Sequence, residues 1–206
     1  MFVRGLSKQT QSNLESLKNA SFVKNYYLAG GTALSLHFGH RFSYDLDFFS
    51  QNPVKPEVIR SGLSKLGKLE IFQNDEGTFN GVLNGIKLSF FIYPYKLLTP
   101  ALDFNGTRVA DISDIACMKI DAISSRGTKR DFIDLYFVCH KFKSLEELTL
   151  LFEKKYSGVK FNKLHIMKSL VYFADAEDQE MPEMIEKIRW EEIRRFFIEK
   201  AGGIRF

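Results

Sequence analysis

Two adjacent glycines, followed within about twenty residues by two aspartates spaced two apart, constrain this chain most. The run Phe22–Ala29 is apolar and rich in β-forming residues, and it ends at Gly30-Gly31. Thr32–Phe38 has helical spacing, and Asp45–Phe49 alternates acidic and apolar residues as a strand does. Glycine lets the backbone approach a ligand closely, and a helix N-terminus attracts phosphate. The chain therefore predicts a strand–helix–strand unit with a phosphate-binding turn.

The two aspartates, Asp45 and Asp47, point to a divalent metal ion. Residues two apart on a strand face the same side of the sheet. Two neighbouring carboxylates repel each other unless a cation joins them. Mg²⁺ prefers one or two carboxylates together with substrate phosphates, so we expect Mg²⁺ or Mn²⁺ here. Either motif alone would fit an ordinary turn or a solvated strand face, but together they predict a metal–phosphate site.

Three polar residues next to these motifs are further candidates. Thr32 is placed to cap the helix or to offer its hydroxyl to phosphate. Arg41 lies close to the aspartates in sequence and is a candidate contact for phosphate. Ser43 is expected either to hydrogen-bond the turn before the strand or to assist the nucleotide site.

Composition excludes several classes of protein. The 206 residues are 45% hydrophobic and 26% charged, which is ordinary for a globular protein and excludes general disorder. No apolar run is long enough to span a membrane, so we expect no membrane partner. Met1–Thr10 has no signal-peptide core, and Cys117 and Cys139 form no CxxC pair. We therefore expect a cytoplasmic protein. A net charge of +4 permits contact with nucleic acid without requiring it. The 20 phenylalanines predict a phenylalanine-rich core.

The two halves of the chain differ in periodicity. The first half carries strand patterns over Lys68–Asn74, Thr78–Leu83 and Lys87–Tyr93, and Asn84-Gly85 predicts a tight hairpin between the last two. From Asp111 onward the apolar spacing is helical throughout. We therefore predict an α+β fold, with a small mixed sheet and helices over residues 1–107 and a helical bundle over residues 108–206.

Lys119 interrupts an apolar helical stripe in the second half. The stripe consists of Ile112, Ile115, Ala116, Ala122 and Ile123. A lysine on a buried face is costly unless its amine is paired or reaches a polar cleft, although it can also snorkel at the edge of the stripe.

Two aspartates follow Lys119 in the next predicted helix. Asp131 follows Thr128 by three residues, as in a capping box, which still allows it to pair with Lys119. Asp134 is expected to bind Arg130 at helical spacing.

Three motifs together resemble a known family. They are GGTAL from Gly30, HRFSYDLDFF from His40 and RGTKRDFIDLY from Arg126. The chain resembles the AbiEii/AbiGii-toxin type of nucleotidyltransferase, within the DNA-polymerase-β-like superfamily, over roughly Leu28 to Lys200. The resemblance implies a polymerase-β-like core over residues 1–107. It also implies transfer of a nucleoside monophosphate from an NTP, in some cases onto tRNA, by the toxin of a toxin–antitoxin or abortive-infection system with a cognate antitoxin. The acceptor that the family implies is an RNA end or a protein hydroxyl.

The same resemblance implies roles for individual residues. Asp45 and Asp47 would bind Mg²⁺, and Gly30, Gly31 and Thr32 would line the triphosphate. In the second half, Lys119 matches the family's lysine and would stabilise the phosphates, and Asp131 with Asp134 matches its downstream acidic pair. Asp45, Asp47, Lys119 and Asp131 are therefore the expected catalytic residues.

One departure from the superfamily pattern leaves alternatives open. The superfamily usually supplies a third carboxylate from a neighbouring strand, but the inward polar residue of Ile86–Phe91 is Ser89, which is no base at neutral pH. A catalytically weak or inactive nucleotide-binding domain is therefore one alternative. A small-molecule nucleotidyltransferase is another, although the basic charge balance argues against a cationic acceptor. A pure protein-interaction module fits the motifs least.

Overall fold

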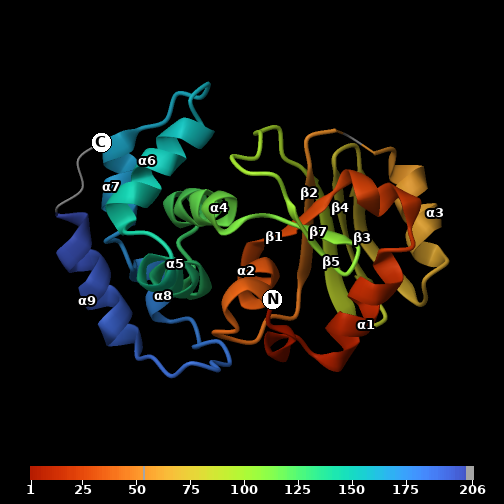
Figure 1. Ribbon diagram of the computed structural model, residues 1–206, viewed down its shortest axis with the longest axis horizontal. Coiled ribbons are helices and arrows are strands. Elements are labelled where there is room, and N and C mark those ends of the chain that lie inside the picture. The colour runs from red at the N-terminus through yellow and green to blue at the C-terminus, as the bar shows by residue number, and fades with distance from the viewer. Residues whose placement is uncertain (53, 203–206) are drawn as a thin grey trace. The chain divides into compact units, whose positions relative to one another are not determined.

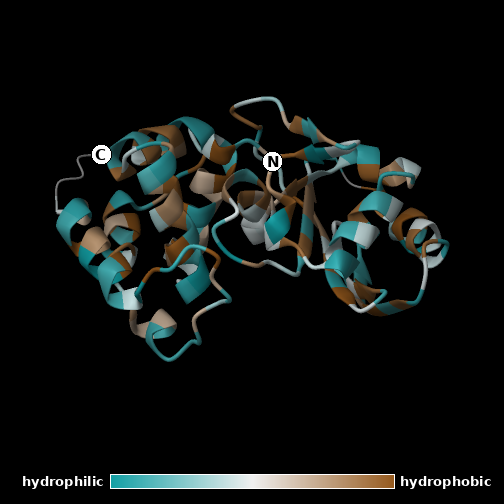
Figure 2. Ribbon diagram, turned by 60° about the horizontal axis from the view of Figure 1, so that its bottom comes forward, coloured by the Kyte–Doolittle hydropathy of each residue, from teal (hydrophilic) through white to brown (hydrophobic). Residues whose placement is uncertain are grey.

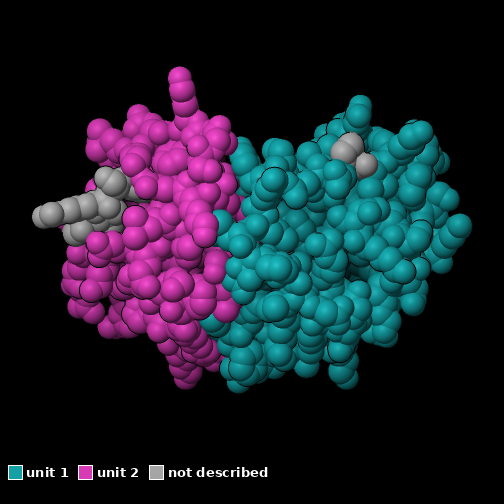
Figure 3. Space-filling model, turned by 45° about the horizontal axis from the view of Figure 1, so that its top comes forward, with its two compact units in different colours: residues 1–111 teal, residues 112–206 magenta. Residues whose placement is uncertain are grey.

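The computed structural model describes residues 1–52 and 54–202, and the chain divides into two compact units (Figure 3). Unit 1 comprises Met1–Asp111 and unit 2 begins at Ile112. This division falls four residues later than the one expected from the sequence. The strand Thr107–Val109 pairs with a central strand of the sheet and therefore stays with unit 1.

Unit 1 is built around a seven-stranded mixed sheet (Figure 1). Its strand order is β3-β4-β5-β2-β1-β7-β6, and the β2/β5 and β1/β7 pairs are parallel. In chain order its elements are η1 (Val3–Gly5), α1 (Lys8–Leu17), η2 (Ser21–Asn25), β1 (Tyr27–Ala29), α2 (Gly30–Phe38), β2 (Leu46–Ser50), α3 (Pro56–Ser64), β3 (Leu69–Asp75), β4 (Thr78–Leu83), β5 (Ile86–Ile92), β6 (Leu102–Phe104) and β7 (Thr107–Val109).

Phe90 on β5 is the centre of the core of unit 1. Its ring contacts four others at centroid distances of 4.9 to 6.1 Å, those of Phe22, Tyr26, Phe48 and Phe79. Helix α3 packs on η2, β3 and β4, and α1 contacts β5. Large aromatic rings therefore fill the space between one face of the sheet and its helices, which confirms the expected phenylalanine-rich core.

The predicted strand Phe22–Ala29 is wrong in its first half. Residues Ser21–Asn25 form the 3₁₀ helix η2, and only Tyr27–Ala29 is a strand. Phe22 and Val23 are both buried, at 4% and 6% exposure. On a strand, adjacent side chains would face opposite sides of the sheet, whereas a helical turn lets both reach the core.

Two Asn-Gly turns close hairpins in unit 1. Asn84 and Gly85 have φ of 50° and 82°, so the predicted hairpin between β4 and β5 is confirmed. Asn105 and Gly106 have φ of 51° and 84° and join β6 to β7 in the same way. The sequence analysis missed this second hairpin, although its Asn-Gly pair is the same signal.

Unit 2 is built from helices, and its described residues include no β-strand. Figure 2 shows hydrophilic and hydrophobic residues alternating along its helices, as amphipathic packing requires. The helices are α4 (Ile112–Ser125), α5 (Lys129–Lys141), α6 (Leu145–Lys155), α7 (Lys163–Ser169), α8 (Ala174–Glu177) and α9 (Trp190–Ala201). α9 ends at Ala201, with Gly202 as its cap.

Aromatic rings and one buried ion pair hold unit 2 together. The Phe132 ring lies 5.1 to 5.9 Å from the rings of Phe173, Trp190 and Phe197. Lys155 on α6 pairs with Asp114 on α4 at 2.6 Å, and both side chains are fully buried. Such a pair is tolerated in the interior because each charge satisfies the other.

Two further properties of the described chain bear on function. Burial raises the pKa of the thiols of Cys117 and Cys139 to about 12, so neither is a thiolate nucleophile near neutral pH. A search of the described residues finds no helix that is both long and apolar enough to cross a membrane.

Candidate active site

The start of α2 brings the backbone against the carboxylate of Asp47. Ala29, the last residue of β1, pairs with Asp47 in the antiparallel β1/β2 register. Gly30 follows with φ of 69°, a left-handed conformation that favours glycine. A Cβ placed on Gly30 would lie 3.4 Å from Asp47 Oδ2. A carboxylate and the N-terminus of a helix therefore meet at a position that requires glycine.

Asp45 and Asp47 flank the first residue of β2. Leu46 and Phe48 are buried, at 1% and 0% exposure, whereas both aspartates are half-buried. The alternation places the two aspartates on the side of the sheet opposite the core. Asp47 lies on the strand as expected, and Asp45 lies immediately before it.

Thr32 ties the first turn of α2 to the segment that leads into β2. Its side chain is buried, and its hydroxyl donates to the main-chain carbonyl of Asp45. It also lies 2.9 Å from the hydroxyl of Ser43. The proton of the Thr32 hydroxyl is therefore used to hold the backbone of the first aspartate in place.

Arg41 puts a permanent positive charge beside Gly31. The residue is only 3% exposed, its Nη1 donates to the carbonyl of Phe42 at 2.9 Å, and its own carbonyl accepts from Ser35 Oγ at 2.7 Å. A Cβ on Gly31 would lie 2.2 Å from Arg41 Nη2. The guanidinium thus occupies the space that a larger residue at position 31 would need.

Ser89 is the direct neighbour of Asp47 on the next strand. In the parallel β2/β5 register, Asp47 pairs with Ser89. Ser89 is 3% exposed, and among the described residues its hydroxyl makes no hydrogen bond. The strand position next to the second aspartate therefore carries a serine and no third carboxylate.

Lys119 lies within a buried ion network in unit 2. Its Nζ is 2.8 Å from Asp131 Oδ1 and 2.7 Å from Asp134 Oδ2, so α4 and α5 are joined by two charge pairs. The expected pairing of the Lys119 amine is confirmed. The expected contact between Asp134 and Arg130 is wrong, because Asp134 is fully buried and faces α4.

The carboxylate of Asp131 accepts hydrogen bonds from three residues. Besides Lys119, Arg126 Nε lies 3.0 Å from its Oδ2 and Thr128 Oγ1 donates to the same oxygen at 2.7 Å. Burial by itself would raise the pKa of Asp131, but the two cations outweigh it and hold that pKa well below its usual range. Asp131 is therefore an ionised carboxylate that organises the junction between α4 and α5.

The predicted site residues thus fall into two groups. Those of unit 1 gather around the N-terminus of α2, and Lys119 and Asp131 belong to unit 2. Sequence reasoning missed the buried position of Asp134; its apolar neighbours on α5 were the available signal.

The chemistry of the unit 1 group fits a metal bound together with substrate. Within residues 1–52 and 54–202 no group of three or more His, Cys, Asp or Glu side chains could hold a metal ion. Mg²⁺ commonly takes one or two carboxylates and completes its shell with phosphate oxygens and water. Two carboxylates beside a helix N-terminus match that requirement.

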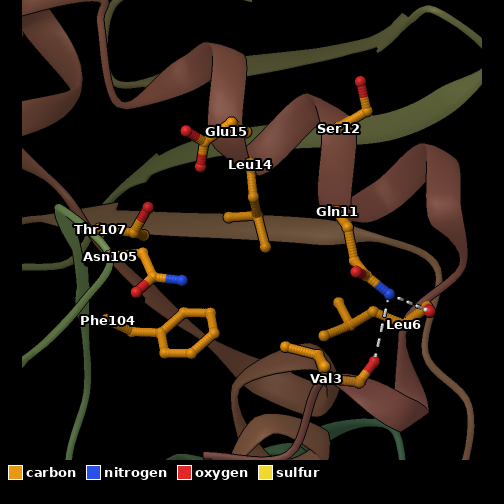
Figure 4. A pocket seen from close by; sticks show the side chains of 9 residues that line it. All are labelled: Val3, Leu6, Gln11, Ser12, Leu14, Glu15, Phe104, Asn105 and Thr107. Atoms are coloured by element: carbon orange, nitrogen blue, oxygen red, sulfur yellow. Dashed lines mark hydrogen bonds between the residues drawn. The ribbon is translucent and has the colours of Figure 1, made fainter.

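A separate pocket in unit 1 lies between the N-terminal segment, α1 and the β6–β7 hairpin (Figure 4). Its volume is about 330 Å³, and none of the candidate site residues lines it. The lining residues are Val3, Leu6, Gln11, Ser12, Leu14, Glu15, Phe104, Asn105 and Thr107.

The mixed sheet places the glycine pair that follows β1 beside the Asp-x-Asp element at β2. The family described as nucleotidyl transferase AbiEii toxin, type IV toxin–antitoxin system, matches residues 14–202. The chain belongs to this family and is a toxin-family nucleotidyltransferase.

The chain is also similar to a curated protein and to solved structures. An uncharacterized protein of Aquifex aeolicus (strain VF5) is 42% identical over 204 residues, which cover 97% of each chain. MenT4, a nucleotidyltransferase toxin of Mycobacterium tuberculosis H37Rv, has a TM-score of 0.59 at 13% identity, covering 94% of this chain and 83% of that one. A putative nucleotidyltransferase of H. pylori has a TM-score of 0.57 at 19% identity, covering 95% and 94%. The last two likenesses show the shared fold.

Gly31→Ala is expected to weaken NTP binding while leaving the fold intact. The new Cβ would collide with the end of the flexible Arg41 side chain, which must move away from the start of α2. Losing one charge-assisted contact to phosphate corresponds to a rise in Kd of roughly tenfold or more. Calorimetric titration with NTP measures this rise. Gly158→Ala is the matched control, because nothing lies within 4 Å of its Cβ; equal Kd values for the two variants would contradict the proximity argument.

Proposed function

We propose that this nucleotidyltransferase transfers a nucleoside monophosphate from an NTP to the end of an RNA acceptor, with Mg²⁺ as its metal. The observation that carries the proposal is the meeting of the Asp47 carboxylate with Gly30 at the N-terminus of α2. A binding-only domain needs no carboxylate pair at that point, because two like charges beside each other cost free energy in the absence of a cation.

Different residues of unit 1 bind the metal ion and the phosphates of the nucleotide. Asp45 and Asp47 would hold Mg²⁺, which when bound neutralises charge on the triphosphate. The backbone at Gly30 and Gly31 and the N-terminus of α2 bind the outer phosphates, and Arg41 adds a fixed cation there.

The reaction is a displacement at the α-phosphorus. The acceptor hydroxyl oxygen bonds to that phosphorus, the bond to the bridging oxygen of the β-phosphate breaks, and pyrophosphate leaves with the electron pair. The proton of the hydroxyl passes to water, because Ser89 offers no carboxylate as a base. Asp47 and the glycine turn hold the nucleotide in the orientation that this displacement needs.

Unit 2 contributes a positioning role in this proposal. The Lys119 amine is held between two buried carboxylates, and Arg126 balances their charge. The network fixes the junction of α4 and α5, so we assign Lys119 and Asp131 to the support of the active conformation.

The partners follow from the family. A type IV toxin implies a cognate antitoxin, which we propose as the protein partner, and we propose the cytoplasm as the place of action. Two alternative functions remain as outcomes of the test: a domain that binds NTP without turnover, and an enzyme that modifies a small molecule.

Transfer is tested directly with labelled nucleotides. Purified protein, Mg²⁺ and each of the four α-³²P-labelled NTPs are incubated with total cellular RNA, and the products are separated on a gel. We expect label in RNA with one preferred NTP and no label without Mg²⁺. Calorimetric NTP binding with no label in RNA would contradict the proposal and favour the binding-only domain.

A further inference from the structure

A row of polar side chains crosses four strands on the sheet face that carries Asp47. Asp47 on β2 pairs with Ser89 on β5, Ser89 pairs with Asn80 on β4, and Asn80 pairs with Gln73 on β3. Directly paired residues of neighbouring strands point to the same face of a sheet. The metal-binding carboxylate proposed above is therefore the end of a continuous polar row.

The hydrogen bonds in this row run away from Asp47. Asn80 Nδ2 donates to Gln73 Oε1 at 2.9 Å, and Gln73 Nε2 donates to Asp75 Oδ2 at 2.9 Å. Among the described residues, no hydrogen bond reaches Asn80 Oδ1 or Ser89 Oγ. Two oxygen atoms are thus left for a ligand, one on the strand next to Asp47 and one on the strand beyond it.

The missing hydrogen bond at Ser89 Oγ points to a ligand because of where Ser89 lies. The residue is only 3% exposed, and among the described residues its Oγ has no hydrogen-bond partner, although it is not one of the fully buried side-chain atoms that lack one. A hydroxyl that can still be reached in this way is able to donate a hydrogen bond to a ligand or accept one from it. Its strand neighbour on the other side is Asp47, so a ligand that satisfies Ser89 would lie beside the proposed site of transfer.

The residues on either side of Ser89 match the parts of a nucleotide. Lys87 and Phe91 lie two positions before and after it on β5, hence on the same face. Lys87 is exposed and has no ion-pair partner among the described residues, so its amine can meet a phosphate. The half-buried rings of Phe91 and Phe49, 5.6 Å apart, offer a surface on which a base can stack.

We propose that Ser89 and Asn80 form the subsite for the acceptor and bind the terminal ribose of an RNA chain. The 2′- and 3′-hydroxyls of that ribose supply the two hydrogen bonds that Ser89 Oγ and Asn80 Oδ1 lack, Phe91 stacks on the terminal base, and Lys87 contacts a backbone phosphate. This assignment deepens the proposed function and rests on it. A protein hydroxyl has no adjacent base or phosphate to meet Phe91 and Lys87.

The first arm of the test compares Ser89→Ala and Asn80→Ala with the native protein in the RNA-labelling assay. Each variant is expected to raise the apparent KM for total cellular RNA about tenfold, the effect of losing roughly one hydrogen bond, while the calorimetric Kd for NTP stays unchanged. Gln9→Ala is the matched control, because it removes an exposed amide on α1 that makes no hydrogen bond with the row. Its KM is expected to stay native.

The second arm measures binding without turnover. A fluorescent pool of short randomised single-stranded RNA is compared with the same pool ending in 2′-deoxyribose. The native protein is expected to bind the ribose-ended pool more tightly, and Ser89→Ala and Asn80→Ala are expected to reduce this preference. Equal binding of both pools by the native protein, or native KM values in both variants, would overturn the subsite. Label that appears in protein in place of RNA would overturn it as well.

The two arms separate this inference from the proposed function. A native protein that binds NTP but labels no RNA refutes the proposed transfer. A native protein that labels RNA while both alanine variants keep its KM and its ribose preference refutes only the subsite.

Discussion

Asp47→Asn is expected to reduce nucleotidyl transfer by about a thousandfold or more, because it removes a metal-binding charge worth several kcal/mol in the transition state, and each 1.36 kcal/mol is tenfold. The side chain is half-buried and its size barely changes, so the fold is expected to survive. The transfer rate with the preferred NTP and a thermal unfolding curve together measure this separation of activity from stability.

Glu76→Gln is the matched control for Asp47→Asn. Glu76 lies in the exposed turn between β3 and β4, and its substitution changes the net charge by the same amount without touching the start of α2. We expect its transfer rate to remain native. If Asp47→Asn transferred within tenfold of the native rate, Asp47 would hold no essential metal ion.

Lys119→Met is expected to lower the free energy of unfolding of the protein by about 3–5 kcal/mol, the usual cost of leaving a buried charge unpaired. The amine contacts both Asp131 and Asp134, which are 1% and 0% exposed. Arg126 continues to pair with Asp131 in the variant, so Asp134 is the carboxylate left without this cation. Urea-induced unfolding followed by circular dichroism measures the change.

A second substitution and a surface control sharpen this prediction. Lys119→Met combined with Asp134→Asn is expected to regain part of the lost stability, because the unpaired charge is removed. Lys141→Met breaks the partly exposed pair with Glu186 and is expected to cost less than about 1 kcal/mol. A Lys119→Met variant as stable as Lys141→Met would show that the buried network is not what stabilises the α4–α5 junction.

Local patterns predicted much of the fold because they report on short stretches of chain. The Asn84-Gly85 turn and the helical second half are both confirmed. Each depends on backbone preferences or spacing within a few residues. The prediction for Phe22–Ala29 failed for the opposite reason. Burial of Val23, and of Phe22 against Phe90, outweighed the preference of both residues for a strand.

The sequence predicted which residue types make up the candidate site, but it did not predict all the contacts between them. The spacing of Asp45 and Asp47 and the glycine pair indicated a phosphate and metal site before any contact was known. The stripe around Lys119 indicated that its amine must be paired. Neither pattern revealed that Arg41 packs on Gly31, or that Asp134 joins Asp131 on the same lysine, because these partners meet through folding.

The sequence alone therefore determined the strand–helix–strand element, the residue types that it carries and the division into a mixed half and a helical half, because each of these follows from local spacing. Only the tertiary structure decided which residue stands beside Asp47. The strand order places β2 between β1 and β5, and the parallel register then aligns Ser89 with Asp47 and Asn80 with Ser89. Strand order and register depend on how distant segments pack against a shared core, so no local pattern in the chain could fix them.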